Sequence, residues 1–463
     1  MFEAAIYRKR RAALVAGLAR RGAGEGLALF LGNGESPMNY ADNTYPFRQD
    51  SSFLYFFGPS RPGLAGTIDL ATGRSAIFAD DASMDDIVWT GPQVSAAELA
   101  ALAGADEALP RGALAARARA AGPAGLLYLP PYREETRREL AELLGTTAAE
   151  ADAGASLPLV QAALELRELK GPEEVAELEA AVATTVRMHR AALDLARPGM
   201  RESEVAATVT GIALAANGAL SFPVIATTRG ATLHNHDHGR VLEEGGLFLL
   251  DCGAETAGGY AGDLTTTFPI GKRFDQRQRA VYEIVLSMGR AATAILRPGL
   301  PFREAHAAAA RAAVEGLSAL GLMRGDPAEA AEKGAHALFF PHGLGHQIGL
   351  DVHDMESYGE DWVGYDGAGR RKDFGWKSLR LGKPLKAGMV HSVEPGLYFI
   401  PELFARWKAE GKFPEHIDYR AVEAWLGLGG VRNEEDWLVT ESGARRLGPD
   451  FDKSVAAIES ARA

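Results

Sequence analysis

The sequence is poor in several features, and each shortage excludes a class of protein. Cys252 is the only cysteine among 463 residues, so no disulfide can form within the chain, and a small secreted fold that depends on disulfides is excluded. No apolar run approaches the roughly 18–20 residues that a membrane-spanning helix requires. Basic residues are outnumbered by acidic ones, 49 to 61, and the net charge of −12 argues against binding nucleic acid or an anionic membrane through bulk electrostatics. We therefore expect a cytoplasmic protein with no nucleic-acid and no membrane partner.

What the chain does contain is the composition of a large globular protein. Hydrophobic residues make up 47% and charged residues 24%, and a length of 463 residues predicts two or three domains. Residues 1–160 are predicted to form an α/β domain, because strand-like runs at 27–31, 66–70 and 126–129 alternate with Ala-rich helical stretches such as 134–144. No cluster of chemically reactive side chains stands out in this region. We expect it to be a supporting or oligomerising domain.

The pattern changes at about residue 161, and residues 161–463 are expected to form the second domain. Gly171-Pro172-Glu173-Glu174 predicts a helix start, with proline and acidic residues in the first turn. Arg197-Pro198-Gly199 ends this helix, and Arg297-Pro298-Gly299 repeats the same ending further along; each leads into an Arg-Glu pair and an Ala-rich helix. Two such units indicate a domain of two similar halves, with helices on one face and antiparallel strands on the other. A chance recurrence of a common helix stop is the alternative.

Strands are predicted after each helical pair, and four acidic residues and one histidine lie in or beside the strand-like or Gly-rich segments. They are Asp251, Asp263, His346, Glu394 and Glu434, and the neighbours of each are apolar. An unpaired carboxylate is costly in such surroundings, and a bound metal ion relieves that cost. Taken singly, each acid is better explained by a surface position or a salt bridge. Together they make an oxygen-rich set that favours a paired site for Mn, Co, Fe or Zn over a single structural zinc site.

Two histidine-rich segments need a separate interpretation. His342 and His346 have the spacing of a helical zinc pair, but the residues between them include two glycines and no glutamate, so the H-E-x-x-H protease motif is excluded. This Gly-rich loop, which continues to His353, instead predicts one ligand together with hydrogen-bonding partners for a substrate. A second tract over residues 233–238 is either a weak metal-binding segment or a polar loop, and His234 is the candidate within it.

A series of motifs in fixed order carries a resemblance to a known family. The segment from Tyr45 to Gly58 is similar to the signature of that family's N-terminal domain. The motifs of the catalytic half are Leu250-Asp-Cys-Gly, Tyr260-Ala-Gly-Asp-Leu-Thr, His342-Gly-Leu-Gly-His, Leu350-Asp-Val-His-Asp, Val393-Glu-Pro-Gly-Leu-Tyr and Gly430-Val-Arg-Asn-Glu. Together they resemble the proline-specific metallopeptidases of the pita-bread fold, aminopeptidase P and prolidase. The resemblance implies an α+β chain: an N-terminal α/β domain, then a pita-bread domain of two pseudo-symmetric halves with an antiparallel sheet and helices.

The resemblance also implies a role for each matching residue. Asp251 would bind the first metal ion, Asp263 and Glu434 would bridge two metal ions, and His346 and Glu394 would complete the second site. Among the other matches, His234 and His353 are catalytic candidates together with Glu394, whereas His342, Arg380 and Arg432 are candidates for substrate binding. Arg380 matches the prolidase arginine that receives the carboxylate of a dipeptide, and Arg432 matches an arginine beside the last ligand.

The sequence departs from the family pattern at three places, none of which removes a ligand. The interval from Asp251 to Asp263 is one residue longer than expected, which a β-bulge would absorb. Asn433 replaces the apolar residue that usually precedes the final ligand. The segment 355–380 is longer and more polar than in the shorter aminopeptidases, so its contribution is left open.

The predicted function is hydrolysis of the Xaa-Pro bond after the N-terminal residue of a peptide or dipeptide by a dinuclear metallo-exopeptidase. The expected cofactors are two divalent metal ions, manganese first, with cobalt, zinc or iron as alternatives. The expected partners are a proline-containing peptide and further copies of the chain, because relatives form dimers or tetramers. Arg380 and the long loop favour a dipeptidase, whereas the N-terminal domain suits both activities. The same fold also hosts a metal-free amidinohydrolase and non-catalytic binding proteins; both are expected to have lost the acidic set.

The chemistry fits this substrate. A pair of divalent cations activates water and polarises a scissile carbonyl. His353 and His234 are the candidates for stabilising the charge that develops on the carbonyl oxygen, and Glu394 for passing a proton to the leaving proline nitrogen. Proline explains why a dedicated peptidase is needed, because its ring fixes φ and removes the N–H group by which other peptidases align a substrate.

Overall fold

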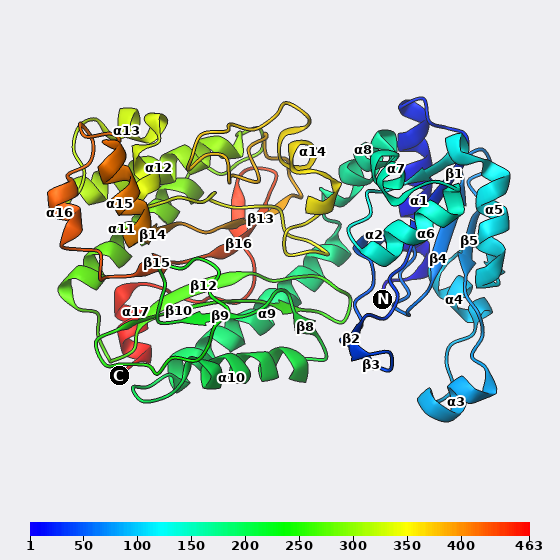
Figure 1. The fold of residues 1–463 in the computed structure, drawn as a ribbon, viewed down its shortest axis with the longest axis horizontal. Helices are drawn as coiled ribbons and strands as arrows, with labels where there is room; N and C mark the ends of the chain where they lie inside the picture. Colours follow the sequence, from blue (N-terminus) through cyan, green and yellow to red (C-terminus); the bar gives the residue numbers. More distant parts are fainter. The chain divides into compact units, whose positions relative to one another are not determined.

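The computed structural model describes all of residues 1–463, and they divide into two compact units (Figure 1). The first unit contains Met1–Arg167 together with Met355–Gly359, and the second contains Glu168–Asp354 and Glu360–Ala463. A boundary between residues 160 and 161 would fall inside a helix, Leu157–Arg167, and the units divide at the end of that helix instead. No helix is both long enough and apolar enough to cross a membrane.

The first unit is built around one five-stranded sheet of order β6-β5-β4-β1-β7. Its helices are α1 (Ala4–Arg20), α2 (Ser51–Phe56), α3 (Met84–Thr90), α4 (Ala96–Ala103), α5 (Leu114–Ala121), α6 (Glu134–Leu144), α7 (Ala148–Ala153) and α8 (Leu157–Arg167). Its strands are β1 (Leu27–Leu31), β2 (Pro37–Tyr40), β3 (Asn43–Thr44), β4 (Ala65–Asp69), β5 (Ser75–Phe78), β6 (Glu107–Leu109) and β7 (Leu126–Tyr128). The strands predicted near residues 27, 66 and 126 and the helix predicted at 134–144 are confirmed.

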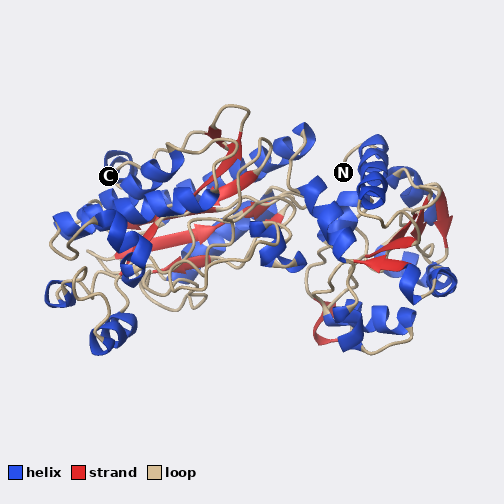
Figure 2. Ribbon diagram, turned by 90° about the horizontal axis from the view of Figure 1, so that it is seen from above, coloured by secondary structure: helices blue, strands red, loops and turns tan.

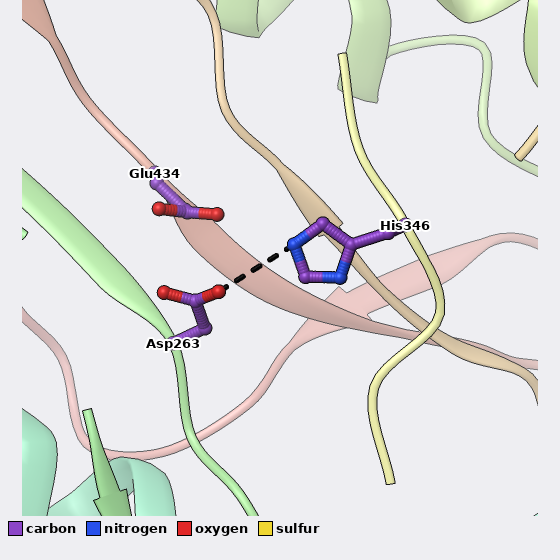
Figure 3. Close-up of side chains that lie close together, drawn as sticks. All are labelled: Asp263, His346 and Glu434. Carbon is purple, nitrogen blue, oxygen red and sulfur yellow. Dashed lines mark ion pairs between the residues drawn. The ribbon is translucent and has the colours of Figure 1, made fainter. Parts of the chain in front are cut away.

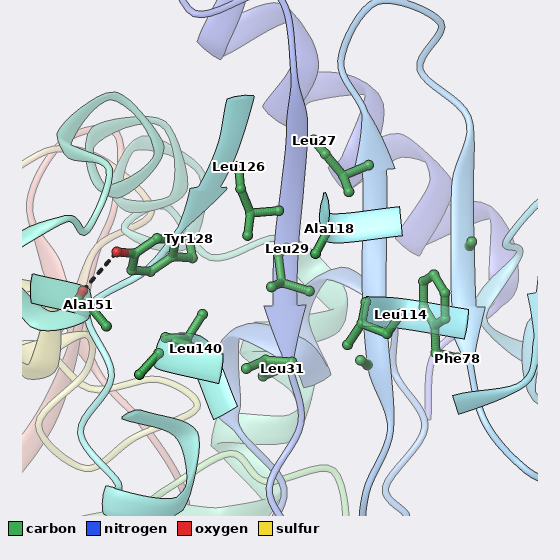
Figure 4. Packing of buried hydrophobic residues seen from close by; sticks show 13 residues of the cluster. Leu27, Leu29, Leu31, Phe78, Leu114, Ala118, Leu126, Tyr128, Leu140 and Ala151 are labelled. Atoms are coloured by element: carbon green, nitrogen blue, oxygen red, sulfur yellow. Dashed lines mark hydrogen bonds between the residues drawn. The ribbon is translucent and has the colours of Figure 1, made fainter. Parts of the chain in front are cut away.

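Strand β1 lies inside this sheet, antiparallel to β4 and parallel to β7, and all five of its residues are buried. Because side chains alternate along a strand, those of β1 point to both faces of the sheet. Leu27, Leu29 and Leu31 belong to a cluster that also includes residues of α5 and α6 (Figure 4). Phe30 instead contacts Phe56 of α2, with ring centroids 4.8 Å apart. A strand buried on both faces explains why this run is apolar throughout rather than alternating.

The second unit carries the longer helices and several short sheets (Figure 2). Its helices are α9 (Pro172–Leu195), α10 (Glu202–Ala215), α11 (Gln276–Thr293), α12 (Phe302–Ala319), α13 (Pro327–Lys333), α14 (Glu360–Tyr365), α15 (Pro401–Glu410), α16 (Tyr419–Glu423) and α17 (Val455–Ala461). Its strands are β8 (Ala219–Leu220), β9 (Ile225–Thr227), β10 (Leu247–Cys252), β11 (Ala254–Glu255), β12 (Leu264–Pro269), β13 (Val390–Val393), β14 (Gly396–Tyr398), β15 (Gly430–Arg432), β16 (Glu435–Val439) and β17 (Ala444–Arg446). The predicted start of α9 is confirmed, with Gly171 at its N-cap and Pro172 as its first residue.

The two Arg-Pro-Gly repeats occupy equivalent places in two similar halves. In the first half the Gly199 N–H donates to the carbonyl of Leu242, and the Leu242 N–H returns a bond to Met200. In the second half the Gly299 N–H donates to the carbonyl of Leu385, and the Leu385 N–H bonds to Leu300. Helix α9 packs on α10 in one half, and α11 packs on α12 in the other. The prediction of two similar halves is therefore confirmed, and the chance recurrence is excluded.

Three strands predicted as continuous are shorter or interrupted. The strand predicted from Tyr260 begins only at Leu264. The predicted strand 389–399 is divided between β13 and β14 by Glu394 and Pro395, where proline supplies no N–H for a ladder. The predicted strand 431–440 is divided between β15 and β16 by Asn433 and Glu434. The ladder of β10 and β12 has no register shift, so the β-bulge expected between Asp251 and Asp263 does not lie in it. The additional residue of this interval instead lies in the connection that contains β11.

Candidate metal centre

A cavity of about 520 Å³ in the second unit brings together every predicted site residue. They come from separate segments of both halves, and the complete set is His234, Asp251, Asp263, His342, His346, His353, Arg380, Glu394, Arg432 and Glu434. The remaining lining is largely apolar and includes Phe222, Leu233, Val352 and Phe374. A cavity with apolar walls and a few convergent polar groups is the usual form of a small-ligand site.

Asp263, His346 and Glu434 form the tightest part of the cavity (Figure 3). Each contributes one potential ligand atom, and these atoms all lie within 4.8 Å of one another. The His346 Nε2 atom is 3.5 Å from Asp263 Oδ2. All three residues are buried, with at most 5% of their surface exposed. Two carboxylates and an imidazole at this separation can share a cation.

The other two predicted ligands lie beside this trio. Glu394 Oε1 is 3.7 Å from His346 Nε2, and its second oxygen is 3.5 Å from His342 Nδ1. Asp251 lies near the end of β10, opposite Thr265 of β12, and its Oδ2 atom accepts a hydrogen bond of 2.5 Å from Arg432. The five side chains proposed from the sequence as a metal-binding set therefore meet in one place.

The backbone explains why these five meet. Asp263 directly precedes β12, while Glu394 and Glu434 lie at the two strand breaks described above. The segment around His346 runs beside β13, because the Glu394 N–H donates to Leu344 and the Ser392 N–H donates to the carbonyl of His346. Gly345 permits this approach, since a Cβ atom there would lie 2.2 Å from the Ser392 carbonyl oxygen. The glycines of this loop thus serve close packing.

The electrostatics of this cluster favour a bound cation. Burial, and then repulsion by neighbouring carboxylates, raises the pKa of Asp263, Glu394 and Glu434 well above the ordinary value. One oxygen of Asp251 and one of Asp263 are buried without a hydrogen-bond partner. Buried polar groups without partners are costly, and a divalent cation would supply both the partner and the opposite charge. The donor set of carboxylates and one imidazole fits Mn, Co, Fe or Zn.

A chain of hydrogen bonds connects Asp251 to His342. Arg432 donates to Asp251 Oδ2, to the Tyr398 hydroxyl at 2.7 Å and to Thr265 Oγ1 at 3.1 Å. The Tyr398 oxygen lies 2.9 Å from His342 Nε2, and His342 Nδ1 lies 2.8 Å from the Gly343 carbonyl. If Nδ1 carries the proton and donates to that carbonyl, Nε2 accepts from Tyr398. Arg432, predicted to bind substrate, is thus engaged with protein groups and orients Asp251.

Two histidines of the cavity, His342 and His234, have lowered pKa values. Burial, with the nearby Arg432 charge second, lowers the pKa of His342 to about 3. The same two causes lower the pKa of His234, which lies in a turn of the 233–238 tract. The His353 ring lies over that of His346, with centroids 3.9 Å apart. The N–H of His342 is already used by the Gly343 carbonyl, whereas a neutral imidazole at His234 or His353 could donate one N–H bond to a substrate oxygen.

Comparisons with known proteins now identify the family. Residues 176–441 match the metallopeptidase family M24, and residues 7–122 match the N-terminal domain of aminopeptidase P. The chain belongs to metallopeptidase family M24. It is therefore a hydrolase, and the predicted combination of an aminopeptidase P N-terminal domain with a pita-bread catalytic domain is confirmed.

Named relatives of this M24 peptidase include both an aminopeptidase and a dipeptidase. A probable Xaa-Pro aminopeptidase of Botryotinia fuckeliana is 32% identical over 88% of the chain and 85% of that protein. The human Xaa-Pro dipeptidase is 30% identical over 91% of the chain and 86% of that protein. Among solved structures, proline aminopeptidase P II from Yersinia pestis is 27% identical with a TM-score of 0.80, covering 100% of this chain and 99% of that one.

Sequence reasoning missed several polar residues that hold the M24 site together. Tyr398 stands in the motif that contains Glu394, but no role was predicted for it. Thr265 Oγ1 donates to Glu434 Oε2 at 2.7 Å, and the Asp263 N–H donates to buried Asp436 at 2.9 Å. The signal for Thr265 was present, since three consecutive threonines in a strand flanked by apolar residues need partners for their hydroxyls.

A second group of imidazoles is buried behind the cavity wall of the M24 domain and predicts a pH dependence of stability. His306 and His336 are fully buried, neither ring nitrogen of His306 has a hydrogen-bond partner, and His306 packs against Trp376 with ring centroids 4.7 Å apart. Burial, and then the neighbouring His336, lowers the pKa of His306 well below its usual value. The unfolded chain therefore binds a proton near pH 6.5 that the folded chain rejects, so stability falls as pH decreases below that value.

We expect His306→Phe to remove this loss. Relative to the wild type, the free energy of unfolding of the variant should rise by about 1.4 kcal/mol between pH 7.5 and pH 5.5. Urea denaturation of both proteins at the two pH values measures this change. A constant difference between the two proteins would show that His306 accepts a proton in the folded state.

Proposed function

We propose that this chain is a dinuclear-metal exopeptidase that hydrolyses the Xaa-Pro bond after the N-terminal residue of peptides or dipeptides. The single observation that carries this proposal is the meeting of Asp251, Asp263, His346, Glu394 and Glu434 in one cavity. Two similar relatives carry the names Xaa-Pro aminopeptidase and Xaa-Pro dipeptidase. A solved structure of Zn-substituted Escherichia coli aminopeptidase P with product is 27% identical, has a TM-score of 0.79 and covers 100% of this chain and 98% of that one.

The metal ions would be divided among the five ligands as follows. Asp251 would bind one ion, His346 and Glu394 would bind the other, and Asp263 and Glu434 would contact both. Manganese is the first choice, with cobalt, zinc or iron as alternatives. When bound, such ions activate water and polarise the scissile carbonyl.

The side chains around this set would supply proton transfer and charge stabilisation. Glu394 lies beside His342 and His346 and is the group proposed to deliver a proton to the leaving proline nitrogen. His234 and His353 line the same cavity and would donate to the carbonyl oxygen as negative charge develops on it. Tyr398 and Arg432 would keep His342 and Asp251 in place through the hydrogen bonds described above.

The apolar walls of the cavity suit the substrate. Phe222, Leu233, Val352 and Phe374 offer surface against which a proline ring and the side chain before it could pack. A proline ring is rigid, so little conformational entropy is lost when such a surface immobilises it. Shape and apolar contact would then replace the alignment by a backbone N–H that proline lacks.

Arg380 is proposed to receive the carboxylate of a dipeptide, and this predicts a substrate-dependent defect. Arg380 lines the cavity, and its Nε atom is 3.9 Å from Glu360 Oε1. For Arg380→Ala we expect kcat/KM on Ala-Pro to fall by about 10–150-fold, because a hydrogen bond to a charged group contributes about 1.5–3 kcal/mol. A longer Xaa-Pro-Yaa peptide should lose much less, since its carboxylate lies further from the scissile bond.

The experiment compares the two substrates for the wild type after chelation, with and without added manganese, and then for the variant. Arg370→Ala is the matched control, because exposed Arg370 also pairs with Glu360 but does not line the cavity. Equal losses on both substrates would show that Arg380 does not bind the carboxylate. No cleavage of either substrate by the wild type with any divalent ion would refute the proposed function.

A cytoplasmic location and assembly into a dimer or tetramer belong to the same proposal. Helix α3 has no buried residue, and Met84, Val88 and Trp89 on it are exposed, Trp89 to 87%. An exposed apolar helix of this kind suits association with another copy of the chain. Light scattering coupled to size-exclusion chromatography distinguishes a monomer from an oligomer.

A further inference from the structure

A buried lysine lies directly behind the two carboxylates proposed to bridge the metal ions. Lys453 comes from the segment before α17, and only 5% of its side chain is exposed. Its Nζ atom donates to the backbone carbonyl of Glu434 at 2.6 Å and to that of Thr265 at 3.0 Å. It is also 3.0 Å from Glu435 Oε1. The two hydrogen bonds and the ion pair of this cation are therefore with the segments that contain or adjoin Asp263 and Glu434, and its Nζ atom also lies 5.3 Å from the centre of the Phe451 ring.

Lys453 makes its contacts at the break between β15 and β16, where regular strand pairing is interrupted. Glu434 lies between β15 and β16, outside the ladders of both, so its carbonyl has no partner within a sheet. Its N–H donates to the carbonyl of Thr265 at 3.0 Å, the same carbonyl that accepts from Lys453. Lys453 thus joins β12 to the strand break by two bonds from a single ammonium group, replacing ladder hydrogen bonds that the break removes.

The same segments also connect the two carboxylates through the Thr265 side chain. Thr265 is two residues after Asp263, and its hydroxyl also donates to Glu434 Oε2 at 2.7 Å. The backbone of Lys453 is itself anchored, because the Tyr282 hydroxyl of α11 donates to its carbonyl at 2.8 Å. The backbone of Lys453 and its ammonium group are thus both bound, so the backbone around Glu434 has little freedom to move.

We propose, on the basis of the metal-dependent function proposed above, that Lys453 is a positioning residue for the metal centre. It acts through the backbone of Glu434 and Thr265 and holds the Asp263 and Glu434 carboxylates close enough to share cations. It does not contact the cavity or the substrate. The alternative is that Lys453 only fastens the C-terminal segment to the domain.

A second cation near the C-terminus provides a control that distinguishes positioning of the metal centre from fastening of the C-terminal segment. Arg462, just after α17, also donates to backbone carbonyls, including Ile270 at 2.7 Å and Pro269 at 3.2 Å. Lys453 and Arg462 therefore fasten opposite ends of β12, Lys453 near Asp263 and Arg462 away from it. Arg462→Met removes a comparable anchor without touching the strand break, so it controls for loss of stability alone.

The test measures manganese binding to metal-free protein by titration calorimetry, together with Tm. For Lys453→Met we expect the Kd for manganese to rise by about 10–100-fold, the usual cost of losing a group that supports a metal ligand. Lys453→Arg, which keeps the charge and the donors, should restore most of the affinity. Arg462→Met should lower Tm while leaving the Kd close to the wild-type value.

Further variants distinguish a positioning role of Lys453 from a purely structural one. Lys453→Gln keeps an amide donor with a shorter reach and is measured in the same way, so the test does not depend on the methionine variant folding. If the folded Lys453 variants bind manganese as tightly as the wild type, or if Arg462→Met weakens binding equally, Lys453 is only a structural anchor. A wild-type protein that binds no divalent ion would overturn the proposed function itself, and this inference with it.

Discussion

Asp263→Asn is expected to lower kcat/KM for an Xaa-Pro peptide by about 1,000-fold or more in the presence of manganese. Loss of a group that merely supports a ligand costs about 10–100-fold, and Asp263 is proposed to contact both ions directly, so its loss should cost more. Asparagine keeps the size of the side chain but removes the charge. Burial, and then repulsion by the neighbouring carboxylates, raises the pKa of Asp263, and the neutral amide removes both costs. The variant should therefore fold at least as well as the metal-free wild type while failing to act.

The measurement pairs kcat/KM with metal content and Tm. Asp237→Asn is the matched control, because Asp237 is an exposed carboxylate of the neighbouring histidine tract and does not line the cavity. That control should retain its activity. Near-normal turnover by Asp263→Asn would end the proposal that this carboxylate holds the ions.

Glu394→Gln is expected to lower kcat by about 10²–10⁴-fold with a smaller change in KM, because general acid–base catalysis contributes about that much. The amide keeps an oxygen that can still face a metal ion, but it cannot hold and release a proton. Glu394 lies in the cavity with one oxygen 3.7 Å from His346 Nε2, where its carboxyl could pass a proton to the leaving group of a bound substrate.

Metal content must be measured alongside kcat to separate the two roles of Glu394. Retained metal with a large loss of kcat supports proton transfer, whereas parallel losses of metal and kcat indicate that Glu394 acts as a ligand only. Glu402→Gln is the control, since Glu402 is an exposed glutamate in the first turn of α15, close in sequence. A variant that keeps its metal and its full kcat would contradict the assignment of proton transfer to Glu394.

The site residues could be predicted from the sequence because four acidic residues and a histidine recur in apolar surroundings, and because motifs in fixed order resemble those of a known family. Asp251 ends an apolar run, and Asp263 and Glu394 lie among glycines and apolar residues; each alone is better explained by a surface position or a salt bridge, and only the joint pattern favoured a metal site. The repeated Arg-Pro-Gly endings likewise indicated two halves, because a helix stop followed by an equivalent helix is a local signal. Each motif is local, and comparing motifs along the chain was enough for both predictions.

The shape of the strands could not be predicted in the same way. The runs 389–399 and 431–440 have strand composition throughout, yet each is broken where a carboxylate enters the cavity. The break at Glu434 depends on partners far away in the chain, namely Thr265 and Lys453. Tyr398 is a similar case, since its role comes from Arg432 and His342 meeting its hydroxyl. Long-range polar contacts of this kind leave no periodic signal in the sequence.

The most direct test is an anomalous difference map of crystals of the wild-type protein soaked in manganese. We predict two peaks in the cavity, both adjoining Asp263 and Glu434, with Asp251 beside one peak and His346 and Glu394 beside the other. Peaks outside this group of side chains, or none at all at saturating manganese, would contradict the dinuclear centre.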